Sequence, residues 1–346
     1  MVYSGVVAVV VGLLAAVALF VPFVAISYRR RGGLSGGRVL AWLAALVYFW
    51  AIWTYTLLPL PSSDSYRCMG VSLDPLGFIP EVRDALAAGG NPLRNRAVQQ
   101  LVLNVALFTP LGFFVRVLGG RGLPTALAAG LGVSALVEFT QLTGVWGLYP
   151  CPYRVFDVVD LETNTLGAAL GSLAALALPG TWRRGGVRPD ADLPRPVTRG
   201  RRWLAMLCDV LGSSLVGWTA AVAVNLVLFY VLGDPAAVDA GTWSLAVGTA
   251  APVTIWLAVT WATGRSVGDL AVQLRYRGGA QPEALARTMR ALGGVVGFVL
   301  LGLLPGGTAQ LLFGALAVLT VPLTAAGRGL PGLLSGRRLT DAREPA

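Results

Sequence analysis

The stretch Leu103–Gly171 decides how this chain is organised. Three pieces of it carry the pattern: LNVALFTPLGF at 103–113, VEFTQLTG at 137–144 and CPYRVFDVVDLETNTLGAALG at 151–171. Each piece belongs to an apolar segment whose polar side chains gather at one end. Asn104 and Asn164 lie near the starts of the first and third segments, and Glu138 and Gln141 lie near the end of the second. If the segments are antiparallel membrane helices, these ends meet at one face.

The composition is typical of a protein that crosses the membrane several times. The 346 residues are 55% hydrophobic and 13% charged, and the mean hydropathy is +0.68. Several apolar runs reach the ~20 residues that a helix needs to cross a bilayer. We therefore predict an all-α, polytopic integral protein of the cell membrane, with membrane lipids as partners.

All 27 basic residues are arginines, and the chain has no lysine and no histidine. This excludes lysine Schiff-base chemistry, the Walker-type phosphate loop, histidine acid–base catalysis and histidine-ligated haem or zinc. The formal charge of +10 would suggest nucleic acid in a soluble protein, but these arginines lie between apolar runs, where topology signals are found. We expect no nucleic-acid partner, no cofactor and no metal, although carboxylates leave a hard cation chemically open.

The hydropathy pattern predicts nine transmembrane helices. The N-terminal run lacks the basic start of a signal peptide, so we expect a retained first span. Five spans are expected in the first half of the chain, at about residues 1–26, 38–60, 99–117, 125–143 and 161–178. Four are expected in the second half, at about 203–232 and 243–263 and as two short spans within 291–326.

The arginines also predict orientation and domain borders. With nine spans and the N-terminus outside, 22 of the 27 arginines fall in cytoplasmic segments, as the positive-inside rule requires, and the C-terminus is cytoplasmic. Seven of them crowd the polar segment Gly180–Arg202. We therefore predict two membrane domains, 1–180 and 203–346, joined by a cytoplasmic linker at 181–202.

This layout places seven polar side chains at the outer end of the N-terminal domain: Asn104, Glu138, Gln141, Arg154, Asp157, Asp160 and Asn164. An unpaired carboxylate inside a span is costly, so Glu138 should face water or a partner, for which Arg154 is the candidate. A structural interpretation is also open, in which Asp160 caps a helix and Glu138 forms a buried clasp to Asn104 or Arg154. We favour a functional site for the set as a whole.

Two smaller features belong to the same region. Gly167 and Gly171 form a GxxxG pattern, which favours close helix packing. Cys68 and Cys151 fall in segments assigned outside, where a disulfide between them would tie the long outer loop to the polar cluster, whereas Cys208 lies within a span.

The N-terminal pattern resembles the VanZ-like family, whose members are associated with teicoplanin resistance. The resemblance covers about residues 38–180, and its pattern fits the five-span layout predicted for the first half of the chain. By this resemblance, the positions that correspond to the family's motif residues are Asn104, Pro110, Gly112, Glu138, Gln141, Arg154, Asp157, Asp160, Asn164 and Gly167.

The second half, with about four spans, resembles the RDD family. The resemblance rests on RRWLAMLCDVL near its start and GRSVGDLAVQLR after its second span. Arg202 and Asp209 fit the first two signature residues, but Pro331 and Gly332 stand where a His-Asp pair is usual. Asp209 needs a partner within its span, and Arg202 lies seven residues before it on the same helix, so one interpretation is a structural ion pair of the two near the cytoplasmic face.

Three functions are compatible with these features. We favour binding of a lipid-linked envelope precursor or an amphiphilic glycopeptide drug at the outer leaflet, contributing to teicoplanin-type resistance. An intramembrane enzyme could use Glu138 with Asp157 or Asp160 as general acid and base, but no nucleophile and base pair stands out, so no catalytic residue is assigned. An ion-coupled transporter could use Asp209.

The arginine bias makes the topology testable. Cysteines introduced at Arg30, Arg195 and Arg338 should be protected from an impermeant maleimide in intact cells, because all three positions are assigned to the cytoplasm. Cys68 should react only after reduction. Labelling of position 338 from outside would contradict the nine-span layout.

Overall fold

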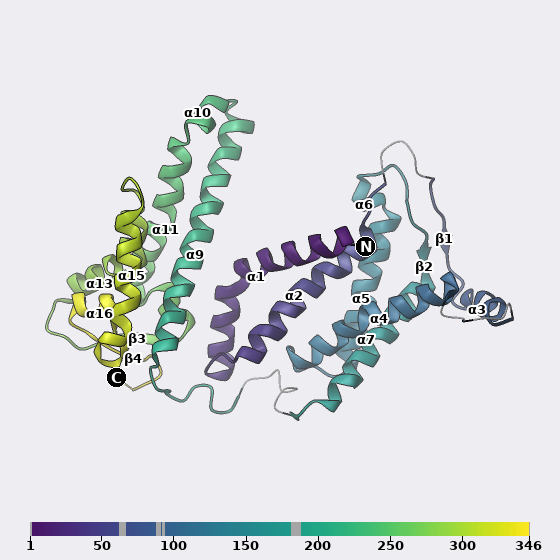
Figure 1. Cartoon of the computed structure of the whole chain (residues 1–346), viewed down its shortest axis with the longest axis horizontal. Helices are drawn as coiled ribbons and strands as arrows, with labels where there is room; N and C mark the ends of the chain where they lie inside the picture. Colours follow the sequence, from purple (N-terminus) through teal and green to yellow (C-terminus); the bar gives the residue numbers. More distant parts are fainter. Residues whose placement is uncertain (1, 62–66, 88–90, 92–93, 181–187, 346) are drawn as a thin grey trace. The chain divides into compact units, whose positions relative to one another are not determined.

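The computed structural model describes residues 2–61, 67–87, 91, 94–180 and 188–345. These residues are mostly helical (Figure 1). Among them, six helices are long and apolar enough to cross a membrane: α1 (Val2–Arg31), α2 (Gly36–Leu57), α4 (Arg96–Val117), α5 (Leu123–Leu142), α9 (Arg199–Leu226) and α11 (Thr242–Thr263). This set fits the predicted multi-pass membrane protein.

The predicted count of nine spans is not confirmed. Helices α13 (Glu283–Leu292) and α14 (Val295–Leu301) are bent by 50° relative to each other, and together they are long and apolar enough for one broken span or a re-entrant loop. Helix α15 (Thr308–Leu323) is apolar but has only 16 residues, and α7 (Val158–Ala174) has 17 and carries Asp160 in its first turn. Hydropathy along the chain does not reveal such bends or short helices.

Two small sheets lie outside the helices, so the chain is not purely α-helical. β1 (Val71–Ser72) pairs in parallel with β2 (Phe156–Asp157), and β3 (Leu274–Arg277) pairs antiparallel with β4 (Arg338–Asp341). Pairing satisfies backbone groups that segments between helices would otherwise leave open. The disulfide that the sequence analysis left open is present: Cys68 and Cys151 are bonded, and they join the segments that carry β1 and β2.

The chain divides into two compact units. Unit 1 comprises Met1–Ala16 and Ser35–Gly186, and unit 2 comprises Val17–Leu34 and Val187–Ala346. Helix α1 therefore contributes to both units, whereas the prediction placed all of residues 1–180 in one domain. Residues 181–187 of the predicted linker lie outside the described residues.

The rest of the predicted linker is held by unit 2. Ala191 is buried, and its carbonyl oxygen accepts a hydrogen bond from Arg343. The backbone N–H of Arg195 donates to the Asp341 carboxylate, which also accepts from Arg201 at the start of α9. Burial alone would raise the pKa of Asp341, but hydrogen bonds from Arg343 and Arg201 outweigh it and hold this pKa well below its usual range.

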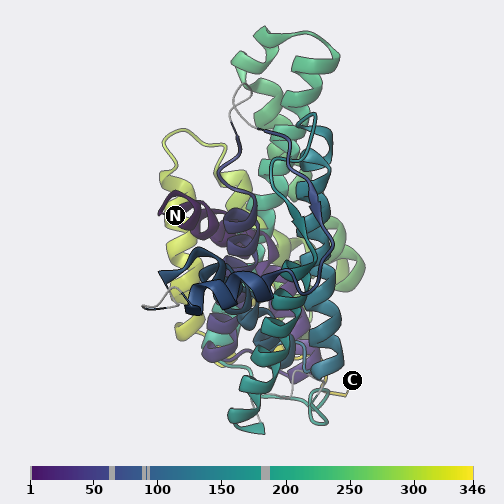
Figure 2. The ribbon, with the colours of Figure 1, turned by 90° about the vertical axis from the view of Figure 1, so that its right-hand side faces the viewer.

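Unit 2 is built on two long helices. In both views α9 and α11 run side by side up to the turn that contains α10 (Pro235–Ala240) (Figures 1 and 2). The short helix α12 (Val267–Ala271) packs against α9, and the unit also contains α13, α14, α15, α16 (Gly329–Ser335), the β3–β4 pair and residues 17–34.

Unit 1 depends on a close contact between α4 and α7. A Cβ atom on Gly112 of α4 would lie 1.7 Å from the carbonyl oxygen of Ala168. On α7, a Cβ atom on Gly171 would lie 1.7 Å from the carbonyl oxygen of Thr109, and Gly167 approaches α4 in the same way. The two backbones therefore touch, and the packing role predicted for Gly167 and Gly171 is confirmed.

Gly171→Ala should lower the thermal midpoint of the purified protein in detergent, because the added methyl meets backbone that cannot move aside. We expect a loss of roughly 1 to 3 kcal/mol or more. Gly132→Ala on α5 is the control, since nothing lies within 4 Å of its Cβ position. Equal midpoints for the two variants would contradict the backbone contact.

Candidate functional site

Unit 1 contains an open polar cleft of about 570 Å³. Its walls come from the first turns of α4, the end of α5, the segment before α7 and the first turn of α7. Five of the seven predicted residues line it: Asn104, Gln141, Arg154, Asp157 and Asp160. The remaining two, Glu138 and Asn164, are buried away from it. We call this cavity the polar cleft.

Asp160 is held in the cleft by two amides of α4. Asn104 Nδ2 donates to Asp160 Oδ1 at 2.6 Å, and Gln100 Nε2 donates to the same oxygen at 3.2 Å. Arg96, which also lines the cleft, precedes Gln100 by four residues, so these three side chains share one face of α4. The sequence analysis did not include Gln100 and Arg96, although they precede Asn104 by four and eight residues, a helical spacing that could have identified them.

Asp157, and not Asp160, caps α7. Its side chain accepts a hydrogen bond from the backbone N–H of Val159 at 3.0 Å. The capping interpretation of Asp160 is therefore wrong, because that residue already lies inside the first turn. A carboxylate there is still favoured by the helix dipole.

Glu138 is 2% exposed and has a structural partner. Its Oε2 atom accepts a hydrogen bond from the backbone N–H of Asp157 at 3.1 Å. The predicted ion pair with Arg154 is wrong: among the described residues no ion pair joins the two, and Arg154 instead donates to the carbonyl of Leu58 at 3.4 Å. The N–H groups at a helix start lack partners within the helix, and one of them meets this carboxylate.

Three residues of the cleft also satisfy the end of α2. Its last carbonyl groups have no partner within the helix. Those of Thr56, Leu57 and Leu58 accept hydrogen bonds from Gln141 at 2.8 Å, Tyr153 at 3.1 Å and Arg154 at 3.4 Å, respectively. The wall of the polar cleft is thereby anchored to a helix that does not line it. Tyr153 is a lining residue that the sequence reasoning did not include.

Asn164 lies behind the cleft, in the contact between α5 and α7. It is 4% exposed, and its amide donates to Ser134 Oγ at 2.8 Å. The helical spacing that placed Asn164 near Asp160 is correct, but the close packing of α5 on α7 covers it. Its role here is to link these two helices.

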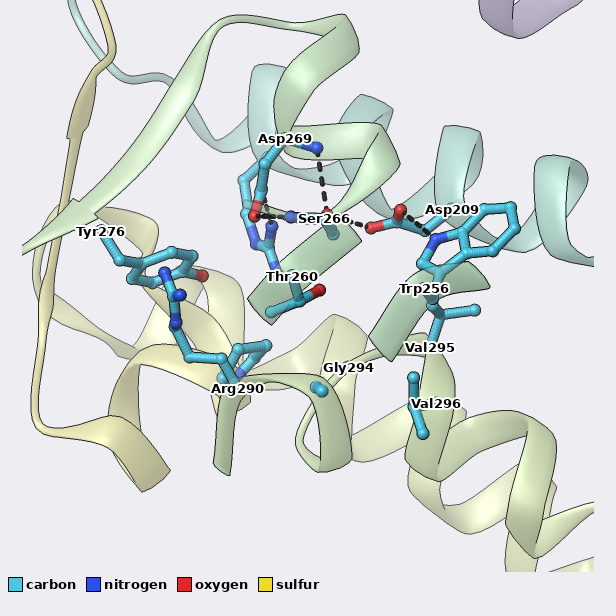
Figure 3. Close-up of a pocket in the computed structure, with 13 residues that line it drawn as sticks. Asp209, Trp256, Thr260, Ser266, Asp269, Tyr276, Arg290, Gly294, Val295 and Val296 are labelled. Carbon is cyan, nitrogen blue, oxygen red and sulfur yellow. Dashed lines mark hydrogen bonds and ion pairs between the residues drawn. The ribbon is translucent and has the colours of Figure 1, made fainter. Parts of the chain in front are cut away.

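In unit 2, the two residues of the predicted pair, Arg202 and Asp209, bind other partners. Figure 3 shows those of Asp209. Arg202 donates to Asp269 at 2.8 Å, and no ion pair joins it to Asp209 among the described residues. Asp209 accepts instead from Trp256 at 2.8 Å, Ser266 at 2.7 Å and the backbone N–H of Gly268 at 2.7 Å. The expected Arg202–Asp209 pair is therefore wrong.

The start of α12 explains this arrangement. Ser266 and Asp269 form a reciprocal capping box, and the N–H of Gly268 in the first turn of α12 donates to Asp209. Asp269 belongs to the quoted segment GRSVGDLAVQLR, but sequence spacing alone did not single it out. In the described parts of the chain, no group of three or more carboxylate or thiol side chains is placed to hold a metal ion.

The region that contains the polar cleft is similar to a known protein family. Residues 39–179 match the VanZ/LLP1 family model. The VanZ-like region contains every residue that lines the polar cleft. It ends before the second half of the chain, and no comparison supports the RDD resemblance of residues 203–346. Neither the curated proteins nor the solved structures include a match.

The Arg202 contacts predict a specific coupling. In double-mutant cycles, Arg202→Met with Asp269→Asn should show a coupling energy within roughly 0.5 to 3 kcal/mol, because the two side chains are directly bonded. The cycle of Arg202→Met with Asp209→Asn should give a smaller value. Unfolding free energies of the purified protein in mixed detergent provide the measurement, and the reverse order would contradict the structure.

Proposed function

We propose that the VanZ-like region binds an amphiphilic ligand of the cell envelope in the polar cleft, and that this binding contributes to glycopeptide resistance of the teicoplanin type. One observation carries the proposal. Five residues predicted from sequence, together with Arg96, Gln100 and Tyr153, line a single open cleft within the matched region 39–179. Asn104, Arg154, Asp157 and Asp160 keep part of their surface exposed to the cleft, whereas Gln141 is buried, as Glu138 and Asn164 are.

The side chains of the cleft suit a ligand that carries both a negative charge and hydrogen-bonding groups. Arg96 and Arg154 line it and supply guanidinium donors, which bind phosphate and carboxylate groups well. Asp157 and Asp160 supply acceptors for hydroxyl or amide groups. Lipid-linked envelope precursors combine phosphate with sugar and peptide groups, and glycopeptide drugs combine carboxylate with sugar and amide groups.

The same proposal includes the orientation. The cleft opens on the outer side of the cell membrane, with the N-terminus outside and the C-terminus in the cytoplasm. The arginine distribution supports this, since 22 of 27 arginines then lie inside. The Cys68–Cys151 disulfide also supports it, because the bond joins segments beside the cleft and such bonds persist in oxidising compartments.

The enzyme alternative receives less support from the geometry. Glu138 does not line the cleft and is engaged by a backbone N–H group, so it cannot reach a ligand bound there. Asp157 is engaged as the cap of α7, and Asp160 by two amides. The binding function needs no such group to be free.

Resistance measurements test the proposal. Asp160→Ala and Arg154→Ala should each reduce protection against teicoplanin in a sensitive host, because each removes a charged contact worth roughly tenfold or more in affinity. Glu162→Gln is the control, since this exposed acid lies on α7 outside the cleft. Membrane protein level is measured in parallel.

Direct binding separates the two ligand classes. Purified protein in nanodiscs is titrated with teicoplanin and with a lipid-linked precursor, and the two cleft variants are compared with Glu162→Gln. Unchanged protection and unchanged affinity in both cleft variants, at equal protein level, would show that the polar cleft is structural.

A further inference from the structure

Unit 2 contains a second cavity, an apolar groove of about 400 Å³ between α9, α14 and α15. Its lining is mostly hydrocarbon and includes Met206, Phe298 and Phe313. This volume falls in the usual range for small-molecule sites, roughly 300 to 1,000 Å³. We call it the apolar groove.

The apolar groove ends at the small polar pocket of Figure 3, whose volume is about 20 Å³. Five residues line both cavities: Arg202, Asp209, Gly294, Val295 and Pro331. Arg290 lines only the small pocket, where it lies over the ring of Tyr276. One elongated site therefore has a hydrocarbon end and a polar end.

At the polar end the acids have partners, whereas the arginines keep unpaired donors. Asp209 accepts three hydrogen bonds, and Asp269 accepts from Arg202. Arg290 is 5% exposed and donates from Nη1 to the carbonyl of Gly264 at 2.6 Å, but its Nε and Nη2 atoms have no partner. The Nε atom of Arg202, which is 4% exposed, has none either. Buried charged donors without partners are costly, so this end is complementary to an anion.

We propose that the apolar groove binds one acyl chain of an anionic phospholipid, with its phosphate directed toward Arg202 and Arg290. Arg202 lines both cavities, so its guanidinium would donate a charge-assisted hydrogen bond to the phosphate, and the buried Arg290 would attract the phosphate through its charge. Basic pockets between membrane helices are a known type of anionic headgroup site. This proposal concerns unit 2 and is independent of the function proposed for the polar cleft.

The position of Trp203 is consistent with a site at the level of the lipid headgroups. It lines the groove, is 41% exposed and donates from its indole to the carbonyl of Val318 at 3.3 Å. Exposed tryptophans of membrane helices mark the level of the headgroups, where an apolar ring with a polar N–H is favoured. The polar end of the groove, near Arg202, therefore lies where a phosphate would be.

Photo-crosslinking of the full-length wild-type protein tests the site without any variant. The protein is placed in nanodiscs with phosphatidylglycerol or phosphatidylcholine that carries a diazirine in the acyl chain, and labelled peptides are mapped. Labelling at Met206, Phe298 and Phe313 should be roughly tenfold higher with phosphatidylglycerol, the difference expected for one charged contact. Equal labelling by both lipids would overturn the anionic preference. Labelling no stronger than at Leu215 and Val222, exposed residues of α9 outside the groove, would overturn the site.

Two variants separate the tail from the headgroup. Met206→Trp fills the groove and should abolish groove labelling at Phe298 and Phe313, whereas Leu215→Trp on the same helix should leave it unchanged. Arg290→Gln should keep labelling but remove the preference for phosphatidylglycerol. Persistent labelling in Met206→Trp, or an unchanged preference in Arg290→Gln, would contradict the proposal. If either variant fails to fold, the wild-type pattern decides.

Discussion

The hydrogen bond from the backbone N–H of Asp157 to the carboxylate of Glu138 determines where α7 begins. A buried carboxylate and an unpaired N–H at a helix start are each costly away from water, and this contact satisfies both. With its N–H held, Asp157 caps α7 through its side chain, so Asp160 falls in the first turn and meets Asn104. Glu138 is therefore a positioning residue for the polar cleft, and it does not itself contact the cavity.

Unpaired backbone groups at a helix end also shape the other wall of the cleft. The terminal carbonyls of α2 accept from Gln141, Tyr153 and Arg154, all of which also face the cavity. A guanidinium has five N–H donors, so Arg154 can hold Leu58 and still present donors to a ligand. For Arg154, completing a helix end is therefore compatible with contacting a ligand.

The helical membrane fold and much of the lining of the polar cleft could be predicted from the sequence. Composition and hydropathy predicted a helical membrane protein, and the one-sided polar ends of three segments predicted five of the residues that line the cleft. The sequence also placed Cys68 and Cys151 in segments on the same side, where their bond is possible. These features depend on local spacing and composition, which the sequence states directly.

The partners of buried charges could not be predicted in the same way. Glu138 pairs with a backbone N–H, and Arg202 pairs with Asp269 across two helices. A sequence does not show which backbone N–H groups lack a partner, and contacts across helices depend on how the helices are rotated and packed. The bend of 50° between α13 and α14 was missed for a related reason, because apolar length alone does not show where a helix breaks.

Hydrogen exchange at the Asp157 amide, followed by NMR on the purified protein, tests the central claim most directly. In the wild-type protein this amide should be protected, and in Glu138→Ala its exchange should become faster, while amides in the middle of α4 keep their protection. Rapid exchange already in the wild-type protein, or equal protection in both proteins, would contradict the account in which Glu138 positions α7 and the polar cleft.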